Sequence, residues 1–466
     1  MKKLTLLLTA LLAAAGADAK VTLPKMFSDG MVMQREADAN LWGTAKAGGE
    51  VKITTSWDGK TYTAKAGADG KWKTAVATPA AGGPYSITLD DGERTTLDDI
   101  LIGEVWICSG QSNMEMPMKG FKNQPVENGV EDMLHSSDSG LRLFTVKLNS
   151  LAAPVDTVGG RWSHAAPASV RNFSATAYYF GRELRRVLGV PVGLIVTSWG
   201  GSSCEAWMRA DWLKPFPSAK IPKTQADVKS KNQTPTVLYN GMLHPLAGYT
   251  MRGVIWYQGE ANVKNHATYA DMLTAMIRGW RGEWGQGDFP FYYCQIAPYQ
   301  YYGKNNSAFL REQQAKAVGM SANTGMAVLM DAGLRYGIHP RKKNLAGLRL
   351  ALLALDKTYK VEGLTSESPR YKAVTFRGDT AVVTFSHADM GMYGRDGLTS
   401  KCFEVAGEDR VFHPAKVWIR RNEVYVKSDA VAHPVAVRYA FKNWADGDMF
   451  CAGLPLGSFR TDDWDE

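Results

Sequence analysis

Between about residues 100 and 355, short apolar runs alternate with longer amphipathic segments, and this alternation constrains the fold most strongly. Short apolar runs fit buried strands, whereas apolar residues spaced three and four apart fit helices. The pattern predicts an α/β fold with a parallel sheet between layers of helices. The predicted strands are 100–108 (interrupted by Gly103 and Glu104), 192–198, 254–257, 291–296 and 326–330, and the predicted helices are 174–188, 268–280, 309–318 and 345–355.

Segments rich in short strands flank this region on both sides. In the N-terminal segment, Asp58-Gly59 separates two alternating runs and predicts a hairpin. In the C-terminal segment, Gly378-Asp379 and Arg421-Asn422 separate similar runs. We therefore expect a β-sandwich over residues 20–98, an α/β domain over 99–355 and a β module over 356–466.

Residues 1–19 have the composition of a secretory signal peptide. Lys2 and Lys3 precede an apolar run, and Ala17-Asp18-Ala19 fits a cleavage site with small residues. The apolar run is too short to span a bilayer. We expect the mature chain to begin near Lys20 and to be periplasmic or extracellular.

The remaining composition narrows the class of protein. The formal net charge is +8, but Lys and Arg are scattered along the chain, which does not indicate nucleic-acid binding. No later apolar run is long enough to span a membrane. The five cysteines are widely spaced and form neither a metal-binding pattern nor a recognisable disulfide framework. We expect no cofactor, and no pattern indicates an oligomeric state.

Polar residues and glycines follow several of the predicted strands. In an open α/β sheet, ligands bind beyond the carboxyl ends of the strands. Acyl transfer requires a nucleophile, a base and donors directed at the developing oxyanion, and the residues at these strand ends could supply the nucleophile and the donors. The residues concerned are Ser112 within Gly110-Gln111-Ser112-Asn113-Met114, Gly200-Gly201, Asn262 and Asp331.

His339 is the preferred candidate for the base because it follows a predicted strand and directly precedes a predicted helix. His244 and His266 are its rivals within the same domain. The chain has no His-x-x-x-His pattern and no close pair of cysteines, so we do not expect a catalytic zinc ion.

Four blocks of sequence occur in the order found in sialate O-acetylesterases, members of the SGNH hydrolase superfamily. They are Gly110-Gln111-Ser112-Asn113-Met114, Trp199-Gly200-Gly201-Ser202, Trp256-Tyr257-Gln258-Gly259-Glu260-Ala261-Asn262 and Ile338-His339-Pro340. The resemblance covers roughly residues 100–355, and the segments 98–118 and 257–262 are its most specific parts. It implies a three-layer SGNH-type hydrolase domain with a parallel sheet.

The resemblance also implies roles for individual residues. Ser112 corresponds to the nucleophile and His339 to its general base. The oxyanion hole would be formed by the Ser112 N–H, Asn262 and one glycine of the Gly200-Gly201 pair, preferably Gly201. The implied reaction is a two-step deacetylation through an acetyl-serine, without a cofactor.

The residue that orients His339 is not determined by the resemblance. Many members of the superfamily carry an aspartate three residues before the histidine, where this chain has Tyr336. Asp331 is our candidate for the third triad member, Glu260 is the alternative, and a Ser–His pair oriented by a backbone carbonyl is also open. The substrate contacts that we expect are Gln111, Gln258 and Glu260.

Three functions are compatible with the sequence. The first is an exported carbohydrate O-acetylesterase acting on acetylated sialic acid. The second keeps this chemistry but acts on acetylated plant polysaccharide such as xylan or pectin, since specificity would lie in loops such as the polar segment 211–235. The third is a non-catalytic glycan-binding protein, which the presence of Ser112, Asn262 and His339 disfavours.

Overall fold

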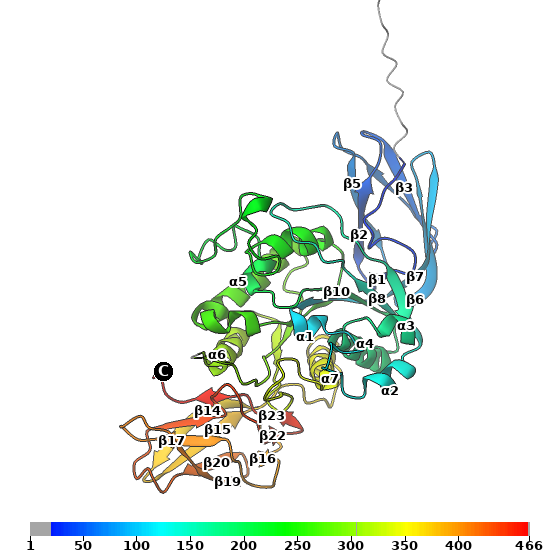
Figure 1. The fold of residues 1–466 in the computed structure, drawn as a ribbon. Helices are drawn as coiled ribbons and strands as arrows, with labels where there is room; N and C mark the ends of the chain where they lie inside the picture. The colour runs from blue at the N-terminus through cyan, green and yellow to red at the C-terminus, as the bar shows by residue number, and fades with distance from the viewer. Residues whose placement is uncertain (1–19, 304, 465–466) are drawn as a thin grey trace, which may run out of the picture.

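The computed structural model describes residues 20–303 and 305–464. The predicted signal peptide lies outside the described residues, and export stays a prediction. At the centre is a mostly parallel sheet in the order β13-β12-β11-β7-β10-β8-β9, in which only β9 runs antiparallel to its neighbour (Figure 1). Its strands are β7 (Arg94–Gly110), β8 (Asp138–Thr145), β9 (Trp162–Ala165), β10 (Val192–Ser198), β11 (Gly253–Tyr257), β12 (Phe291–Cys294) and β13 (Thr324–Ala327).

Helices cover both faces of this sheet, as the apolar strands require. In β7, Val105 and Ile107 pack into the core beneath α5, whereas Trp106 and Cys108 point to the opposite face beneath α4 and α7. The result is the predicted three-layer α/β domain. The helices are α1 (Ser112–Glu115), α2 (Gly129–Leu134), α3 (Pro167–Val170), α4 (Ala175–Leu188), α5 (Tyr269–Trp284), α6 (Ser307–Ala317) and α7 (Lys343–Leu353).

Local signals at α4 are confirmed by its observed ends. The Ser174 hydroxyl accepts a hydrogen bond from the Ala177 N–H at 3.1 Å, and Gly189 ends the helix in the left-handed conformation with a φ of 67°. Strands β8 and β9, by contrast, were not predicted, because Arg142 interrupts the apolar run. The Arg142 side chain is buried and bonds both oxygens of Asp99, at 2.6 and 2.9 Å.

The predicted interruption of the first strand is wrong, because β7 runs unbroken for 17 residues. A Cβ atom at Gly103 would lie 2.0 Å from the Pro191 carbonyl oxygen, so glycine permits the close approach of the neighbouring chain. Glu104 is fully buried and is tolerated because Arg35 and Arg252 contact its carboxylate at 2.6 and 2.8 Å. The two residues that suggested a break are therefore packing features of a continuous strand.

The N-terminal module shares β7 with the central sheet. The first part of β7 pairs with β6 and β1, and the last part pairs with β10 and β11. The predicted boundary at residues 98/99 thus falls inside one strand. The module's other strands are β1 (Val32–Gln34), β2 (Asp38–Thr44), β3 (Glu50–Thr55), β4 (Thr61–Lys65), β5 (Lys71–Ala77) and β6 (Gly82–Asp90).

The C-terminal β module lies on the other side of the α/β domain from the N-terminal module (Figure 1). The two predicted hairpins are present as β14–β15 and β19–β20. Arg311 of α6 anchors the module, because its fully buried guanidinium donates to the Lys442 and Ala440 carbonyls and to Ser458. The strands are β14 (Arg370–Arg377), β15 (Thr380–Ser386), β16 (Tyr393–Gly394), β17 (Phe403–Ala406), β18 (His413–Pro414), β19 (Lys416–Arg420), β20 (Glu423–Lys427), β21 (Ala436–Tyr439), β22 (Met449–Cys451), β23 (Leu454–Pro455) and β24 (Phe459–Arg460).

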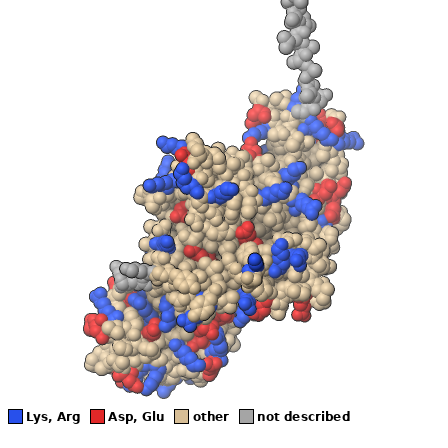
Figure 2. All heavy atoms as spheres, viewed as in Figure 1, with Lys and Arg blue, Asp and Glu red and all other residues tan. Residues whose placement is uncertain are grey.

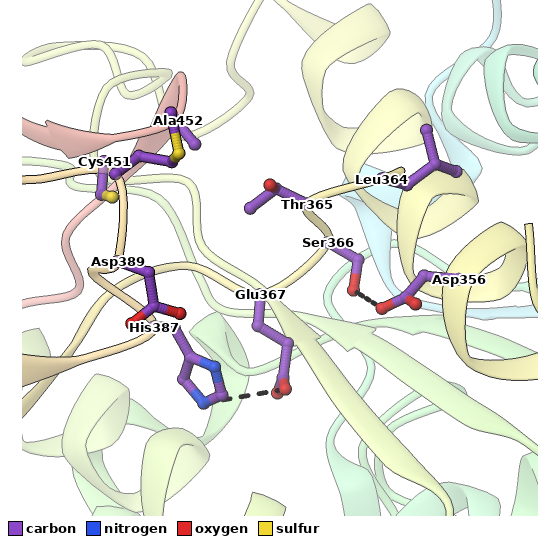
Figure 3. Close-up of a pocket in the computed structure, with 10 residues that line it drawn as sticks. Asp356, Leu364, Thr365, Ser366, Glu367, His387, Asp389, Cys451 and Ala452 are labelled. Atoms are coloured by element: carbon purple, nitrogen blue, oxygen red, sulfur yellow. Dashed lines mark hydrogen bonds and ion pairs between the residues drawn. The ribbon is translucent and has the colours of Figure 1, made fainter. Parts of the chain in front are cut away.

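A pocket of about 200 Å³ lies at the junction between the α/β domain and this module (Figure 3). Asp356 accepts a hydrogen bond from Ser366 there, and the His387 ring lies 3.7 Å from Glu367. The pocket adjoins the carboxyl end of α7, a helix about 16 Å long, whereas the sequence blocks described above lie near the amino end. It is therefore separate from the candidate site.

Two further observations concern the described residues only. None of their helices combines the length and apolar character needed to cross a bilayer. Within the same ranges, no group of three or more His, Cys, Asp or Glu side chains is arranged to hold a metal ion.

Candidate active site

Ser112 lies at the carboxyl edge of the sheet, as the first residue of α1. Strand β7 ends at Gly110, whose φ of 139° and close contact with the Tyr257 carbonyl exclude a side chain; a Cβ there would lie 2.2 Å from that oxygen. The Gln111 N–H then donates to the same carbonyl at 2.9 Å. Ser112 is half-buried, and within the described chain its N–H donates to no other group. The turn thus presents a hydroxyl and an adjacent free N–H.

Asn262 is held from behind by two donors. Its Oδ1 accepts from the Cys204 N–H at 3.0 Å and from Gln258 Nε2 at 2.7 Å. These two bonds direct the amide nitrogen the other way, where one of its hydrogens bonds Glu205 Oε2 at 2.9 Å. The second hydrogen has no partner among the described residues, which leaves one donor free.

Gln258 and Gln111, which we expected as substrate contacts, hold the turn that carries Asn262. Gln258 is completely buried, and its Oε1 accepts from the Tyr269 hydroxyl at 2.8 Å. Gln111 is 3% exposed, and its Oε1 accepts from the Gly259 and Ala261 N–H groups at 3.2 and 3.3 Å. The Gln258 side chain is thus bonded at both ends inside the protein, whereas Gln111 Nε2 donates no hydrogen bond within the described chain.

The Gly200-Gly201 turn packs directly against Ser112. A Cβ at Gly200 would lie 3.4 Å from Ser112 Cβ, and the Gly200 N–H donates to Glu115 Oε2 at 2.5 Å. Burial raises the pKa of Glu115, an effect that this hydrogen bond opposes. Gly201 has a φ of 70°, and no bond from its N–H is found in the described chain. Gly201 therefore has the free N–H, although Gly200 is the nearer to Ser112.

The polar segment 211–235 contributes to this turn, as we expected of an insertion near the site. Asn232 Nδ2 donates to the Gly200 carbonyl at 2.6 Å, and Gln233 Nε2 donates to the Gly201 carbonyl at 3.1 Å. These bonds tie the insertion to the edge of the candidate site.

His339 is oriented by an amide. Its Nδ1 lies 2.6 Å from Gln124 Oε1, and the Phe121 ring packs edge-on against the imidazole with centroids 5.1 Å apart. Because the amide oxygen can only accept, this bond assigns the proton to Nδ1 and leaves the Nε2 lone pair available. Burial, assisted by the Lys343 charge, lowers the pKa of His339 to about 4. The imidazole is therefore neutral at physiological pH, as a base must be.

Asp331 does not contact His339, contrary to our expectation. Both of its carboxylate oxygens accept from the Arg349 guanidinium at 2.7 Å, and Arg349 also donates to the Val328 carbonyl at 2.9 Å. The bidentate ion pair fixes the carboxylate against α7. Gln124 occupies the position at His339 Nδ1 that we expected the acid to fill.

Asn113 joins the Ser112 turn to the His339 loop. Its Nδ2 donates to Glu260 Oε1 at 2.5 Å and to the Ile338 carbonyl at 3.2 Å, immediately before His339. Its Oδ1 accepts from Lys343 Nζ. Asn113 is completely buried, so these bonds form away from water and hold the two turns together.

Glu260 and Lys343 lie on either side of this amide. Glu260 thus neither orients His339 nor offers Oε1 to a substrate, and its buried Oε2 has no hydrogen-bond partner in the described chain. Burial raises the pKa of Glu260 and lowers that of Lys343 to about 7. Lys343 Nζ also lies 5.5 Å from the centre of the Tyr257 ring.

Sequence reasoning missed both Gln124 and Lys343. Gln124 lies in a loop without a motif. Lys343 follows two other basic residues and so resembles part of an exposed charged run, but it precedes Ala346 and Leu350 by three and seven residues, a spacing that puts it on the buried side of α7.

The two rival histidines have other contacts. The His244 ring lies 3.4 Å from the Tyr239 hydroxyl and 3.6 Å from Glu283. The His266 ring stacks on Phe309 with centroids 5.1 Å apart. Neither is joined to the Ser112 turn by a hydrogen bond within the described residues.

Comparisons with known proteins identify the family of this chain. The family model for the carbohydrate esterase, sialic acid-specific acetylesterase, matches residues 102–336. The sialate O-acetylesterase of Rattus norvegicus is 30% identical over 91% of this chain and 90% of its own length, and that of Homo sapiens is 32% identical over 73% and 71%. The crystal structure of a carbohydrate acetylesterase from Xanthomonas citri aligns with a TM-score of 0.87 and 38% identity, covering 95% of this chain and 100% of the other. The chain therefore belongs to the family of sialic acid-specific carbohydrate acetylesterases.

Proposed function

We propose that this protein removes O-acetyl groups from sialic acids through a covalent acetyl-Ser112 intermediate. The family supports a carbohydrate acetylesterase, and the names of its relatives favour sialic acid as the sugar. The observation that carries the serine mechanism is the Asn113 bridge between the Ser112 turn and the carbonyl before His339. It joins the nucleophile and its base at one edge of the sheet.

In the first half of the reaction, Ser112 Oγ attacks the acetyl carbonyl carbon while His339 Nε2 takes the hydroxyl proton. The negative charge on the carbonyl oxygen is stabilised by the Ser112 N–H, the free Asn262 N–H and the Gly201 N–H. The bond between the carbonyl carbon and the sugar oxygen then breaks. The sugar leaves as an alcohol, because His339 returns the proton to that oxygen.

In the second half, a water molecule attacks acetyl-Ser112 while His339 Nε2 takes a proton from it. The bond to Ser112 Oγ breaks, the proton returns to Oγ, and acetate is released. Gln124 replaces the usual carboxylate in holding Nδ1, so it fixes the tautomer without adding a negative charge.

The test measures acetate release from O-acetylated sialic acid, acetylated xylan and acetylated pectin by the wild type and Ser112→Ala. We expect the highest kcat/KM on sialic acid and a loss of several orders of magnitude in Ser112→Ala, with an unchanged unfolding midpoint. Faster release from xylan or pectin would move the substrate to plant polysaccharide. Activity of Ser112→Ala within about tenfold of the wild type would exclude the serine mechanism.

A further inference from the structure

A cleft of about 880 Å³ opens beside the carboxyl end of β8. Its walls come from the end of β8, the loop that returns to β9 and the segment before α4. Lys25, from the start of the N-terminal module, completes one side. Its lining combines apolar groups such as Phe173 with polar groups such as Asn172, a mixture suited to a sugar.

The charges of this cleft have one sign. Lys25, Lys147 and Arg161 line it, and none of its lining residues is Asp or Glu. All three cations are exposed, and in the described part of the chain none of them has an ion pair or side-chain hydrogen bond. Figure 2 shows Lys and Arg side chains on the face of the α/β domain that Figure 1 presents, with Asp and Glu side chains among them. Unpaired cations around a concave surface attract anions.

The cleft opens at the same edge of the sheet as Ser112. In the sheet register, Thr145 of β8 is level with Val196 of β10, which is level with Cys108 of β7. Gly110 ends β7 two residues further along, and Lys147 lies two residues beyond the end of β8; β7 and β8 are about two strand spacings apart, roughly 10 Å.

The opposite wall of the cleft is bonded to the segment after Ser112. The Phe173 carbonyl accepts from the Met118 N–H at 2.9 Å, and Asn172 Oδ1 accepts from Lys119 Nζ at 2.8 Å. A sugar whose acetyl group is at Ser112 can therefore reach the cleft by passing over the carboxyl end of β10, the one strand between β7 and β8.

We propose that this cleft binds the carboxylate of an acidic sugar and selects anionic over neutral acetylated glycans. The proposal rests on the proposed function, since it takes Ser112 as the position of the acetyl group. Each exposed cation contributes little by itself, but three cations facing one carboxylate act together. Such attraction raises the association rate and weakens with salt.

The test reverses the three charges in Lys25→Glu/Lys147→Glu/Arg161→Glu. The control, Lys372→Glu/Arg377→Glu/Arg421→Glu, makes the same change in net charge on exposed residues of the C-terminal module. We expect kcat/KM for O-acetylated sialic acid to fall at least about tenfold in the cleft variant, and that for acetylated xylo-oligosaccharides to stay within about twofold. The control variant should match the wild type on both substrates. At high sodium chloride, the difference in kcat/KM between the cleft variant and the wild type should shrink.

A second measurement separates this proposal from the proposed function. Binding of free sialic acid, measured by titration calorimetry in a Ser112→Ala background, should weaken in the cleft variant and in the single variant Lys147→Gln. Unchanged binding, or an equal loss on acidic and neutral substrates, overturns the cleft assignment while leaving the serine mechanism intact. A Ser112→Ala protein that still releases acetate overturns the mechanism, while the calorimetric comparison still tests the cleft.

Discussion

Gln124 Oε1 lies 2.6 Å from His339 Nδ1, so a neutral amide fixes the imidazole where a triad would have a carboxylate. A neutral partner orients the ring but does not stabilise its cationic form. In the proposed mechanism, the imidazolium that forms during attack is therefore stabilised less than in a Ser-His-Asp triad.

Replacing this amide should separate orientation from charge. Gln124→Leu removes the acceptor, and we expect kcat to fall about 10- to 100-fold because the tautomer is no longer fixed. Gln124→Glu keeps an acceptor and adds a charge that favours the imidazolium, so the acidic limb of the kcat/KM profile should move to higher pH. Steady-state kinetics across pH provide the measurement. Unchanged profiles in both variants would show that Gln124 does not orient the base.

The acidic limb of the wild type should lie near the lowered pKa of His339, about 4, rather than near 6.5. Above this pH the base is neutral and active, and activity is lost as the pH falls through it. The same group makes the protein less stable in acid. Because its folded pKa lies below its unfolded value, the unfolded chain binds the proton first and stability falls between about pH 6.5 and pH 4. In His339→Gln, the free energy of unfolding measured with denaturant should lack the fall that His339 causes between about pH 6.5 and pH 4.

Lys343→Met tests the buried amine, with the exposed neighbour Lys342→Met as the matched control. The folded pKa of Lys343, about 7, lies below its unfolded value of 10.5, so the unfolded chain binds more protons between them. Wild-type stability should consequently rise with pH across that window, and Lys343→Met should lack this rise.

The same variant tests whether Lys343 affects the base. Its charge contributes to the low pKa of His339, so the acidic limb of activity should move to higher pH in Lys343→Met. If Lys343→Met lowers the stability but leaves the acidic limb of the activity profile at the same pH, the role of Lys343 is limited to supporting Asn113. Lys342→Met should reproduce the wild type in both measurements.

Asp331→Asn should affect stability more than turnover. The substitution leaves the buried Arg349 side chain without its ionic partner, which typically lowers the free energy of unfolding by about 3–5 kcal/mol. The loss is smaller if the new amide keeps one hydrogen bond to Arg349. We expect a lower unfolding midpoint and kcat within about fivefold of the wild type. A large loss of kcat at an unchanged midpoint would restore Asp331 to the role of orienting acid.

Asn262→Ala should lower kcat about 100- to 1,000-fold with little change in KM, since one oxyanion donor is typically worth about 3–4 kcal/mol. An effect confined to KM would instead assign Asn262 to substrate binding. Steady-state kinetics on a small acetyl ester distinguish these results.

The sequence predicted the fold well where apolar periodicity and turn residues determine it. Helix α4, with its Ser174 cap and Gly189 stop, is the clearest example. Prediction failed where contacts distant in sequence decide the outcome. Three residues illustrate this: Glu104 within a strand, Gln124 beside the imidazole and Lys343 in the core. The position of each depends on a partner far away in the sequence, which local patterns cannot reveal.

The shared strand β7 determines how the protein should come apart. The first half of β7 belongs to the N-terminal module and the second half to the central sheet. If the chain were cut before Ile100, the residues of β7 that follow the cut would lose β6 as their pairing partner. The two units should therefore melt in a single calorimetric transition. A fragment starting at Ile100 should be prone to aggregation, because it would carry an unpaired strand edge. The N-terminal module is thus a folding partner of the α/β domain and not a removable attachment.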